Sequence, residues 1–314
     1  MASFEEIVLF YEDRYDIIGQ WFLTPGTKVV LGDSTNRKCR FCDRAEPEVS
    51  FKSVAHAIPE SLGNKSIESM YECDDCNSFF GRGIENDLGN WSKPIRSLMR
   101  IRGKSGVPSL ANGGPKGWRI DYGQPSGFEI EQYEHDPIFS VDEQNRVVHF
   151  SLKRDSYTPV AVLKALMKIG LTLIPDEEVK NFVHLKNWVR HPDHSIPFVE
   201  GLPVLYTLQP GFMPPNKIAA FILRRKQGAQ DCPYAFLVLS YGNETYQVML
   251  PSAQHDGEQV SHAIYAFPTP GAMDPQAFLP PKVGRLDLTS REKKVGDIVQ
   301  IDMGYVEAVP SPDG

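Results

Sequence analysis

Apolar and polar positions along the chain predict a strand, a turn and a helix between residues 49 and 88. Residues 49–54 roughly alternate apolar and polar side chains, which is typical of a strand with one buried face. Pro59 ends this pattern, and Gly63-Asn64 is a turn signal. Apolar residues then recur at positions 80, 84 and 88, which favours one face of a helix that follows Asn77.

The remainder of the chain is predicted to mix helices with antiparallel strands, so the expected fold class is α+β. Residues 4–22 are rich in apolar and aromatic side chains and are expected to contain a helix that packs on the segment just described. Residues 160–171, which follow Pro159, and residues 176–190 predict two further helices. Short apolar runs predict strands at 147–152, 204–208, 219–224, 234–241 and 246–250, with Gly242-Asn243 as a hairpin turn.

A passage rich in glycine and proline, residues 105–135, is the expected boundary between two domains. The chain has 314 residues, which suits two domains of ordinary size. We expect a first domain over residues 1–105, a loop-rich linker over 106–135, and an α+β domain with an antiparallel sheet over 136–314. No apolar run is long enough to span a membrane, and the first residues lack the pattern of a signal peptide, so a cytoplasmic location is expected.

Net charge argues against a uniformly basic surface, but the sequence contains a local basic stripe. The chain carries a net charge of −7, whereas binding to phosphates favours positive charge. Between residues 93 and 104 there are five basic residues and no acid, and Arg82 precedes them. A solvated helix face is one interpretation of this stripe, and contact with a nucleic-acid backbone is the other. The proposed contact residues are Arg82, Lys93, Arg96, Arg100, Arg102 and Lys104.

Four of the five cysteines form two CxxC units, which predict a structural zinc site. Cys39 and Cys42 form the first unit, and Cys73 and Cys76 form the second. Four thiolates complete the tetrahedral shell of Zn²⁺ and leave no position for a catalytic water. The alternative, a pair of redox dithiols, normally belongs to a thioredoxin-like βαβ context that is not visible in this sequence. Cys232 is expected to be a small buried apolar residue.

The order of these features resembles the ββα-metal core of HNH endonucleases, in the subgroup with two CxxC knuckles. His56, Pro59 and Gly63 lie between the two knuckles, and Asn77 follows the second knuckle directly. The resemblance covers roughly residues 30–105. It implies a zinc-stapled nuclease domain that uses one Mg²⁺ or Mn²⁺ ion to hydrolyse a phosphodiester bond, with His56 as the general base that activates water.

The resemblance also implies a set of ligands for the catalytic ion, and the sequence departs from that set at one position. Asn77 is the implied ligand, although an asparagine before a helix is also a favoured cap. The family usually has an acid immediately before the histidine, but this chain has Ala55. Glu60 and Glu72 are the candidate replacements. Asn64 is expected to act either as a ligand or as the residue that orients the His56 loop.

The expected function is therefore a metal-dependent DNA endonuclease. Stand-alone proteins of this size in the family resemble effectors of bacterial antiviral defence or of mobile elements, which is an analogy only. The C-terminal part is expected to bind a protein partner, a regulatory ligand or nucleic acid. A double-strand cut would require a homo-oligomer or two successive binding events by one molecule. The alternative function is a zinc-stabilised module that binds nucleic acid or protein without catalysis. Ala55 favours that alternative.

Overall fold

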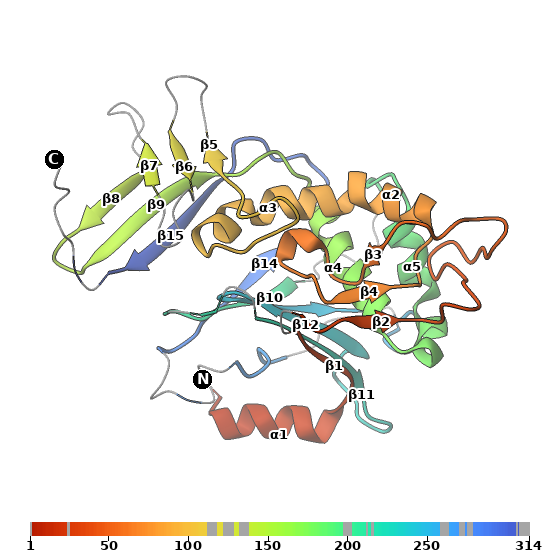
Figure 1. The fold of residues 1–314 in the computed structure, drawn as a ribbon. Helices are drawn as coiled ribbons and strands as arrows, with labels where there is room; N and C mark the ends of the chain where they lie inside the picture. The colour runs from red at the N-terminus through yellow and green to blue at the C-terminus, as the bar shows by residue number, and fades with distance from the viewer. Residues whose placement is uncertain are drawn as a thin grey trace.

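The computed structural model has the mixed α+β architecture that the sequence predicts, with antiparallel sheets and a cluster of four cysteines. Figure 1 shows the arrangement of the elements. The residues described in it are 2–23, 26–111, 118–121, 129–131, 138–196, 203–211, 213–214, 217–257, 264–269, 274, 279–305 and 307.

A six-stranded sheet forms the centre of the molecule, in the order β1-β11-β12-β13-β10-β14. Its strands are β1 (Tyr15–Leu23), β10 (Pro203–Leu208), β11 (Ile218–Arg225), β12 (Ala235–Tyr241), β13 (Glu244–Met249) and β14 (Lys282–Asp287). Neighbouring strands are antiparallel throughout. The predicted hairpin turn at Gly242-Asn243 is confirmed, since Gly242 has a φ of 55° in the left-handed region and joins β12 to β13.

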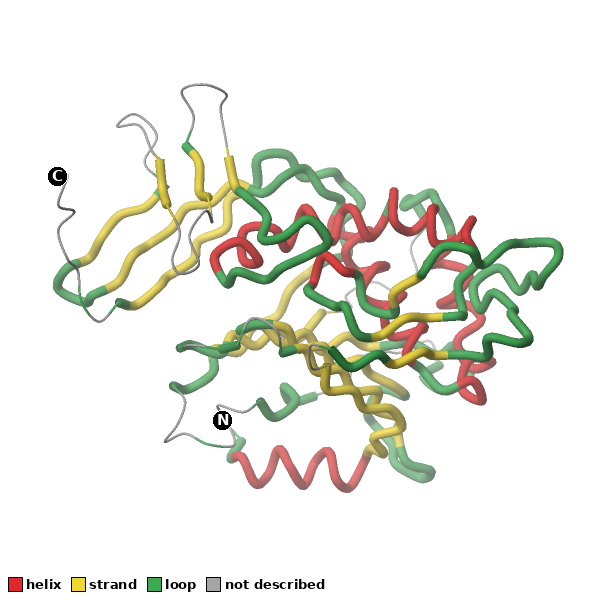
Figure 2. The backbone as a smooth tube through the Cα atoms, in the orientation of Figure 1, coloured by secondary structure: helices red, strands yellow, loops and turns green. Residues whose placement is uncertain are grey.

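Helices cover both faces of this sheet (Figures 1 and 2). They are α1 (Phe4–Arg14), α3 (Ile84–Leu98), α4 (Pro159–Leu173) and α5 (Val183–Arg190), with a 3₁₀ segment at Asp176–Phe182 before α5. Alternation along β13 shows the two faces. The Tyr246 ring packs against Trp91 of α3, whereas the next residue, Gln247, donates a hydrogen bond of 2.8 Å to the Tyr11 hydroxyl of α1.

Residues 4–22 contain the predicted helix, but it does not pack where it was expected to. It ends at Arg14, and the chain continues as β1, which pairs with β11 some 200 positions later. Ser3 and Glu6 form a capping box that fixes the start of the helix. Because Tyr11 contacts Gln247, the helix lies on the central sheet rather than on the cysteine-containing segment.

A small second sheet and one helix carry the cysteines. Its strands, in the order β2-β4-β3, are β2 (Val29–Leu31), β4 (Ile67–Ser69) and β3 (Ala55–His56), and helix α2 (Asp74–Arg82) follows the second knuckle. The prediction of a strand over 49–54 is wrong. Asp74 instead accepts hydrogen bonds from the Ser50 hydroxyl and from the backbone N–H groups of Lys52 and Ser53, so no strand partner is needed there.

The predicted helical face at positions 80, 84 and 88 is confirmed, although a break at Gly83 divides it between two helices. Phe80 lies in α2, while Ile84 and Leu88 lie in α3, and all three side chains are buried. Gly83 closes α2 by donating its N–H to the carbonyl oxygens of Phe79 and Phe80. Both helices therefore turn their apolar side chains to the same core.

Two three-stranded sheets form an arm beside the central sheet (Figure 1, upper left). One contains β5 (Leu110–Ala111), β6 (Arg119–Asp121) and β7 (Glu129–Glu131); the other contains β8 (Phe139–Asp142), β9 (Val147–Lys153) and β15 (Ile298–Gly304). The predicted linker 106–135 thus contributes three short strands, and its residues 112–117, 122–128 and 132–135 lie outside the described residues. A separate apolar cluster fills the arm.

One apolar core includes residues from both predicted domains. Phe41, Phe80 and Leu88 belong to the same buried cluster as Leu166 of α4 and Val238 of β12. Strand β1 also lies in the sheet that the C-terminal strands build. The division at residues 105 and 136 therefore stays a proposal about how the chain is organised, and the two parts share a sheet and a core.

Candidate metal centre and catalytic site

The four predicted cysteine ligands converge at one point. The sulfur atoms of Cys39, Cys42, Cys73 and Cys76 all lie within 4.8 Å of one another, and the Sγ atoms of Cys42 and Cys73 are 3.7 Å apart. Zinc–sulfur bonds of about 2.3 Å in a tetrahedron place the sulfurs about 3.8 Å apart, so the cluster has the dimensions of a zinc site. Within the described residues, this is the one group of three or more His, Cys, Asp or Glu side chains placed to hold a metal ion.

Local backbone geometry explains why the knuckles meet. The first knuckle is a tight turn in which Asp43 donates its N–H to the Cys39 carbonyl oxygen (2.9 Å) and Cys39 donates to the Arg44 carbonyl oxygen (2.8 Å). In the second, Cys73 is the N-cap of α2, and Cys76 lies in the first turn of that helix. Two thiolates therefore lie at the positive end of a helix, which favours negative charge there.

His56 lies at the end of β3, opposite Glu68 of β4 in the antiparallel register. Its side chain is 20% exposed, whereas the preceding Ala55 is buried, with 2% of its surface exposed. The His56 Nε2 atom is 3.6 Å from Oε2 of Glu60, which begins the 3₁₀ turn η1 (Glu60–Leu62). The Nδ1 atom is buried and has no hydrogen-bond partner among the described residues. The sequence-predicted pair of His56 and Glu60 is thus brought together in space.

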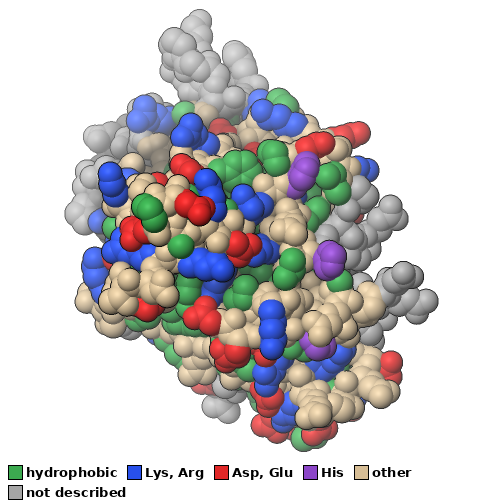
Figure 3. Space-filling model, turned by 90° about the vertical axis from the view of Figure 1, so that its right-hand side faces the viewer, with side chains coloured by type: hydrophobic (Ala, Val, Ile, Leu, Met, Phe, Trp, Pro, Cys, Tyr) green, Lys and Arg blue, Asp and Glu red, His purple; other side chains and the backbone are tan. Residues whose placement is uncertain are grey.

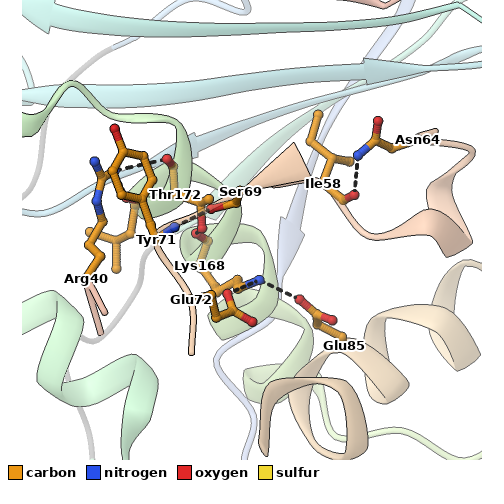
Figure 4. A network of polar contacts seen from close by, with 10 residues as sticks. Arg40, Ile58, Asn64, Ser69, Tyr71, Glu72, Glu85, Lys168 and Thr172 are labelled. Atoms are coloured by element: carbon orange, nitrogen blue, oxygen red, sulfur yellow. Dashed lines mark hydrogen bonds and ion pairs between the residues drawn. The ribbon is translucent and has the colours of Figure 1, made fainter. Parts of the chain in front are cut away.

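Asn64 is fully buried, and its side chain makes four hydrogen bonds to the backbone. Its amide nitrogen donates to the carbonyl oxygens of Ile58 (2.7 Å) and Ile67 (3.0 Å), and its oxygen accepts from the N–H groups of Ser66 (2.9 Å) and Ile67 (3.0 Å). No donor or acceptor remains for a metal ion. Asn64 therefore ties the loop after His56 to β4, as Figure 4 shows in part, and the orienting role is the one that the geometry supports.

Asn77 does not cap a helix. Cys73 is the N-cap of α2, and Asn77 lies within the helix, with its N–H bonded to the Cys73 carbonyl oxygen (2.9 Å). The predicted capping role is therefore wrong, because the helix begins four residues earlier than expected. The Asn77 side chain is partly exposed and makes no hydrogen bond to any described residue. Its carboxamide remains available as the proposed ligand of a catalytic ion.

Glu72 is occupied elsewhere and is removed from the candidate acids. Its side chain is fully buried and pairs with the buried Lys168 of α4, with an Oε2–Nζ distance of 2.7 Å. The same amine lies 2.8 Å from Glu85 of α3 (Figure 4). Desolvation disfavours the charged amine, but the two carboxylates outweigh that cost and raise the pKa of Lys168. Glu72 thus joins the zinc knuckle to α4, and Glu60 is the acid that remains near His56.

Two further cations, which the sequence reasoning missed, join the first knuckle to the C-terminal part. Arg40 is 7% exposed and donates to the carbonyl oxygens at the end of α4, those of Leu171 (2.8 Å), Thr172 (3.0 Å) and Ile174 (2.8 Å). Its guanidinium also lies 3.5 Å from the Tyr71 ring centroid (Figure 4). Lys186 of α5 donates to both carboxylate oxygens of Asp43, at 2.6 and 2.8 Å. The sequence signal for the buried Lys168 was its place, with Lys164, inside an apolar helix, and no comparable signal marks Arg40 or Lys186.

Replacing Arg40 with alanine is expected to lower the free energy of unfolding by about 2–4 kcal/mol, because three buried carbonyl oxygens lose a charged donor. Arg44→Ala is the matched control in the same knuckle. Arg44 is 45% exposed in its ion pair with Asp75 (3.3 Å), so its removal is expected to cost no more than about 0.5 kcal/mol. Urea denaturation of both variants measures the difference, and equal losses would refute the capping role of Arg40.

The predicted basic stripe is divided by the fold. Arg96 does not belong to an exposed stripe, because the residue is only 6% exposed and its guanidinium donates hydrogen bonds to protein carbonyl oxygens. Lys93 pairs with Asp155 at 2.7 Å, while Arg82, Arg102 and Lys104 are exposed and Arg100 is half-buried. On the face shown in Figure 3, Lys and Arg side chains alternate with Asp and Glu. Phosphate contact by the remaining residues of the stripe stays a proposal.

Comparison with known proteins gives one match. Residues 39–91 match the family model described as HNH endonuclease. No curated protein and no solved structure matched the chain. The matched segment contains both knuckles, His56, Asn64 and Asn77, and the resemblance predicted from the sequence is confirmed over residues 39–91. An HNH domain indicates nuclease activity on a nucleic-acid substrate, and the cysteine cluster is compatible with structural zinc.

Proposed function

We propose that the protein is a metal-dependent endonuclease that hydrolyses DNA phosphodiester bonds, with His56 as the general base. The observation that carries the proposal is the placement of His56. It lies at a strand end within the matched segment, its side chain is partly exposed, and its Nδ1 has no partner among the described residues. Most buried polar atoms in folded proteins are hydrogen-bonded, so an unpaired ring nitrogen is an exception that a functional role would explain.

The neighbours of the ring fit proton transfer. A neutral imidazole has one ring nitrogen that can accept a proton from water, and the Glu60 carboxylate lies 3.6 Å from Nε2 of this ring. The same carboxylate stabilises the imidazolium that forms when the proton is taken.

Few protein ligands remain for a catalytic ion. When bound, Mg²⁺ or Mn²⁺ neutralises charge on the scissile phosphate and on the departing 3′ oxygen. Ala55 offers no ligand, so the residues proposed to hold the ion are Glu60 and Asn77, and substrate phosphate and water complete the shell. Such an arrangement suits Mg²⁺, which commonly keeps several waters and binds one or two carboxylates.

Glu60→Gln is expected to raise the Mn²⁺ concentration needed for half-maximal cleavage by about 10- to 100-fold. The substitution keeps the shape of the side chain and removes the charge that attracts the ion. Rates measured over a Mn²⁺ series test this, with Glu48→Gln, an exposed acid in the first knuckle loop, as the control. An unchanged half-saturation point would remove Glu60 from the metal site. A lower rate at saturating Mn²⁺ would then assign it to the imidazolium.

The substrate is tested by a cleavage panel of duplex DNA, single-stranded DNA and RNA of matched sequence, run with Mg²⁺ and with Mn²⁺. The proposal predicts cleavage of DNA, and cleavage of RNA alone would overturn that part of it. Dissociation constants for the substrates must be compared at one salt concentration, because phosphate contacts make binding strongly salt-dependent.

The second candidate function is a zinc-stabilised module that binds nucleic acid or protein without catalysis. Ala55 favours it, because the usual metal-binding acid is absent there. The two functions differ in whether the protein binds a second metal ion besides the zinc. A nuclease binds Mn²⁺ at a site distinct from the four cysteines, whereas the binding module has no such site and leaves every substrate intact.

We also propose that the C-terminal part regulates the nuclease activity. Arg40, Lys168 and Lys186 bind the two knuckles to α4, α5 and the segment after α4, which supports transmission between the parts. A role as an effector in defence or mobile-element biology, a cytoplasmic location and a homo-oligomer are proposed on the same footing. In the described part of the chain, no helix combines the length and apolar character needed to cross a bilayer.

A further inference from the structure

Arg96 of α3 is a buried cation with three hydrogen bonds and no acidic partner among its bonds in the described residues. Its Nη1 donates to the Ser61 carbonyl oxygen (2.9 Å), its Nη2 to the Gly89 carbonyl oxygen (2.8 Å), and its Nε to the Ser92 hydroxyl (3.0 Å). The side chain spans from α3 to the η1 turn. A buried guanidinium is costly unless its donors are satisfied, so this geometry is closely specified.

The turn that Arg96 holds carries Glu60, the acid beside His56. Ser61 is the central residue of η1, so a bond to its carbonyl oxygen fixes the turn one residue after Glu60. Gly103 packs on the same turn. A Cβ atom at Gly103 would lie 3.3 Å from Cα of Ser61 and 3.4 Å from the Glu60 carbonyl oxygen. The turn is therefore held by a cation and by a close backbone contact.

We infer that Arg96 is a positioning residue, which sets the Glu60 carboxylate against His56 Nε2 through its bond to Ser61. The inference rests on the proposed function, which it extends to a residue outside the matched segment 39–91. It replaces the interpretation from sequence, in which Arg96 contacts phosphate. A lysine offers one nitrogen and cannot reproduce the three directed bonds of the guanidinium, so Arg96→Lys keeps the charge and loosens the turn.

The two roles of Arg96 give different kinetics. A positioning residue acts on the geometry of the reacting groups, so Arg96→Lys is expected to lower kcat by about 10- to 100-fold with little change in KM or in the salt dependence of binding. A phosphate contact removed from the surface, as in Arg102→Ala, is expected to weaken binding and to reduce the salt slope by about one. Gly103→Ala displaces the same turn without a change of charge and is expected to act like Arg96→Lys.

The experiment measures kcat, KM and the salt slope for these three variants beside His56→Ala, together with the ¹⁵N shifts of the His56 ring in the zinc-loaded protein without Mg²⁺. Lower kcat at constant KM and a moved His56 ring signal, in both Arg96→Lys and Gly103→Ala, supports the inference. A raised KM with an unchanged kcat in Arg96→Lys overturns it, as does an unmoved ring signal with unchanged kcat in both variants. Full activity of His56→Ala would instead refute the proposed function, while the ring shifts still test the positioning role.

Discussion

Removal of zinc is expected to unfold the whole protein rather than the knuckles alone. The free energy of structural zinc binding, on the order of 10 kcal/mol or more, becomes folding energy when the apo site has no structure of its own. Here Cys39 and Cys73 belong to the same apolar core as α4 and the central sheet. Arg40 contacts α4 and Glu72 contacts Lys168 in the buried interior, so disorder of the knuckles is expected to spread to α4 and the central sheet.

Cys73→Ser is the variant that tests this expectation. It removes one of four ligands at the cap of α2, and we expect it to lose zinc and the cooperative thermal transition together. Cys232→Ala is the matched control, because Cys232 is fully buried, as predicted, but lies outside the cluster. It is expected to keep one zinc per chain. Metal analysis with circular dichroism decides the question, and an apo protein with a native spectrum and transition would refute it.

Replacing His56 with alanine is expected to reduce the rate of DNA cleavage by at least about 10²- to 10⁴-fold, the range that general-base catalysis contributes. The loss is expected in kcat, because the ring acts in the transition state rather than in substrate binding. Folding is expected to be retained, since Nδ1 has no partner among the described residues and Nε2 faces the side chain of Glu60.

His184→Ala is the control for that experiment. His184 is exposed on α5, outside the matched segment, so its removal is expected to leave the cleavage rate unchanged. Single-turnover measurements with both zinc-loaded variants separate chemistry from product release. Cleavage by His56→Ala at the wild-type rate would refute the role assigned to this residue.

Local features of the chain were predictable because they depend on neighbours in sequence. The CxxC spacing predicted the cysteine cluster, the helical period at positions 80, 84 and 88 predicted the buried face, and Gly242-Asn243 predicted the hairpin turn. The predicted strand 204–208 is β10, and the predicted helix 160–171 lies within α4. The predicted helix 176–190 begins as a 3₁₀ segment and becomes α-helical at Val183.

Features that depend on distant partners were not predictable in this way. Residues 15–23 have enough apolar side chains for a helix, yet they form a strand because β11 supplies a long antiparallel partner. Residues 49–54 alternate like a strand, but Asp74 binds their backbone instead. Arg96 lies in a basic stripe by sequence, and only the contact with Ser61, 35 positions away, shows that it is buried.

The candidate site shows the same division. His56 was predicted from the family pattern, and of the two roles predicted for Asn64 its four hydrogen bonds support the orienting one. The choice between Glu60 and Glu72 needed the structure. Glu72 is adjacent to Cys73 in sequence, but Lys168 of α4 binds it, and that pairing is set by the packing of α4 against the knuckles.

The most direct test of the central claim is the cleavage of duplex DNA by the zinc-loaded protein as a function of Mn²⁺ concentration. We expect no cleavage without the added ion and a rate that rises to a plateau as Mn²⁺ is added. A zinc-loaded, folded protein that leaves DNA intact at every Mn²⁺ concentration would contradict the proposal that the protein is a metal-dependent DNA endonuclease.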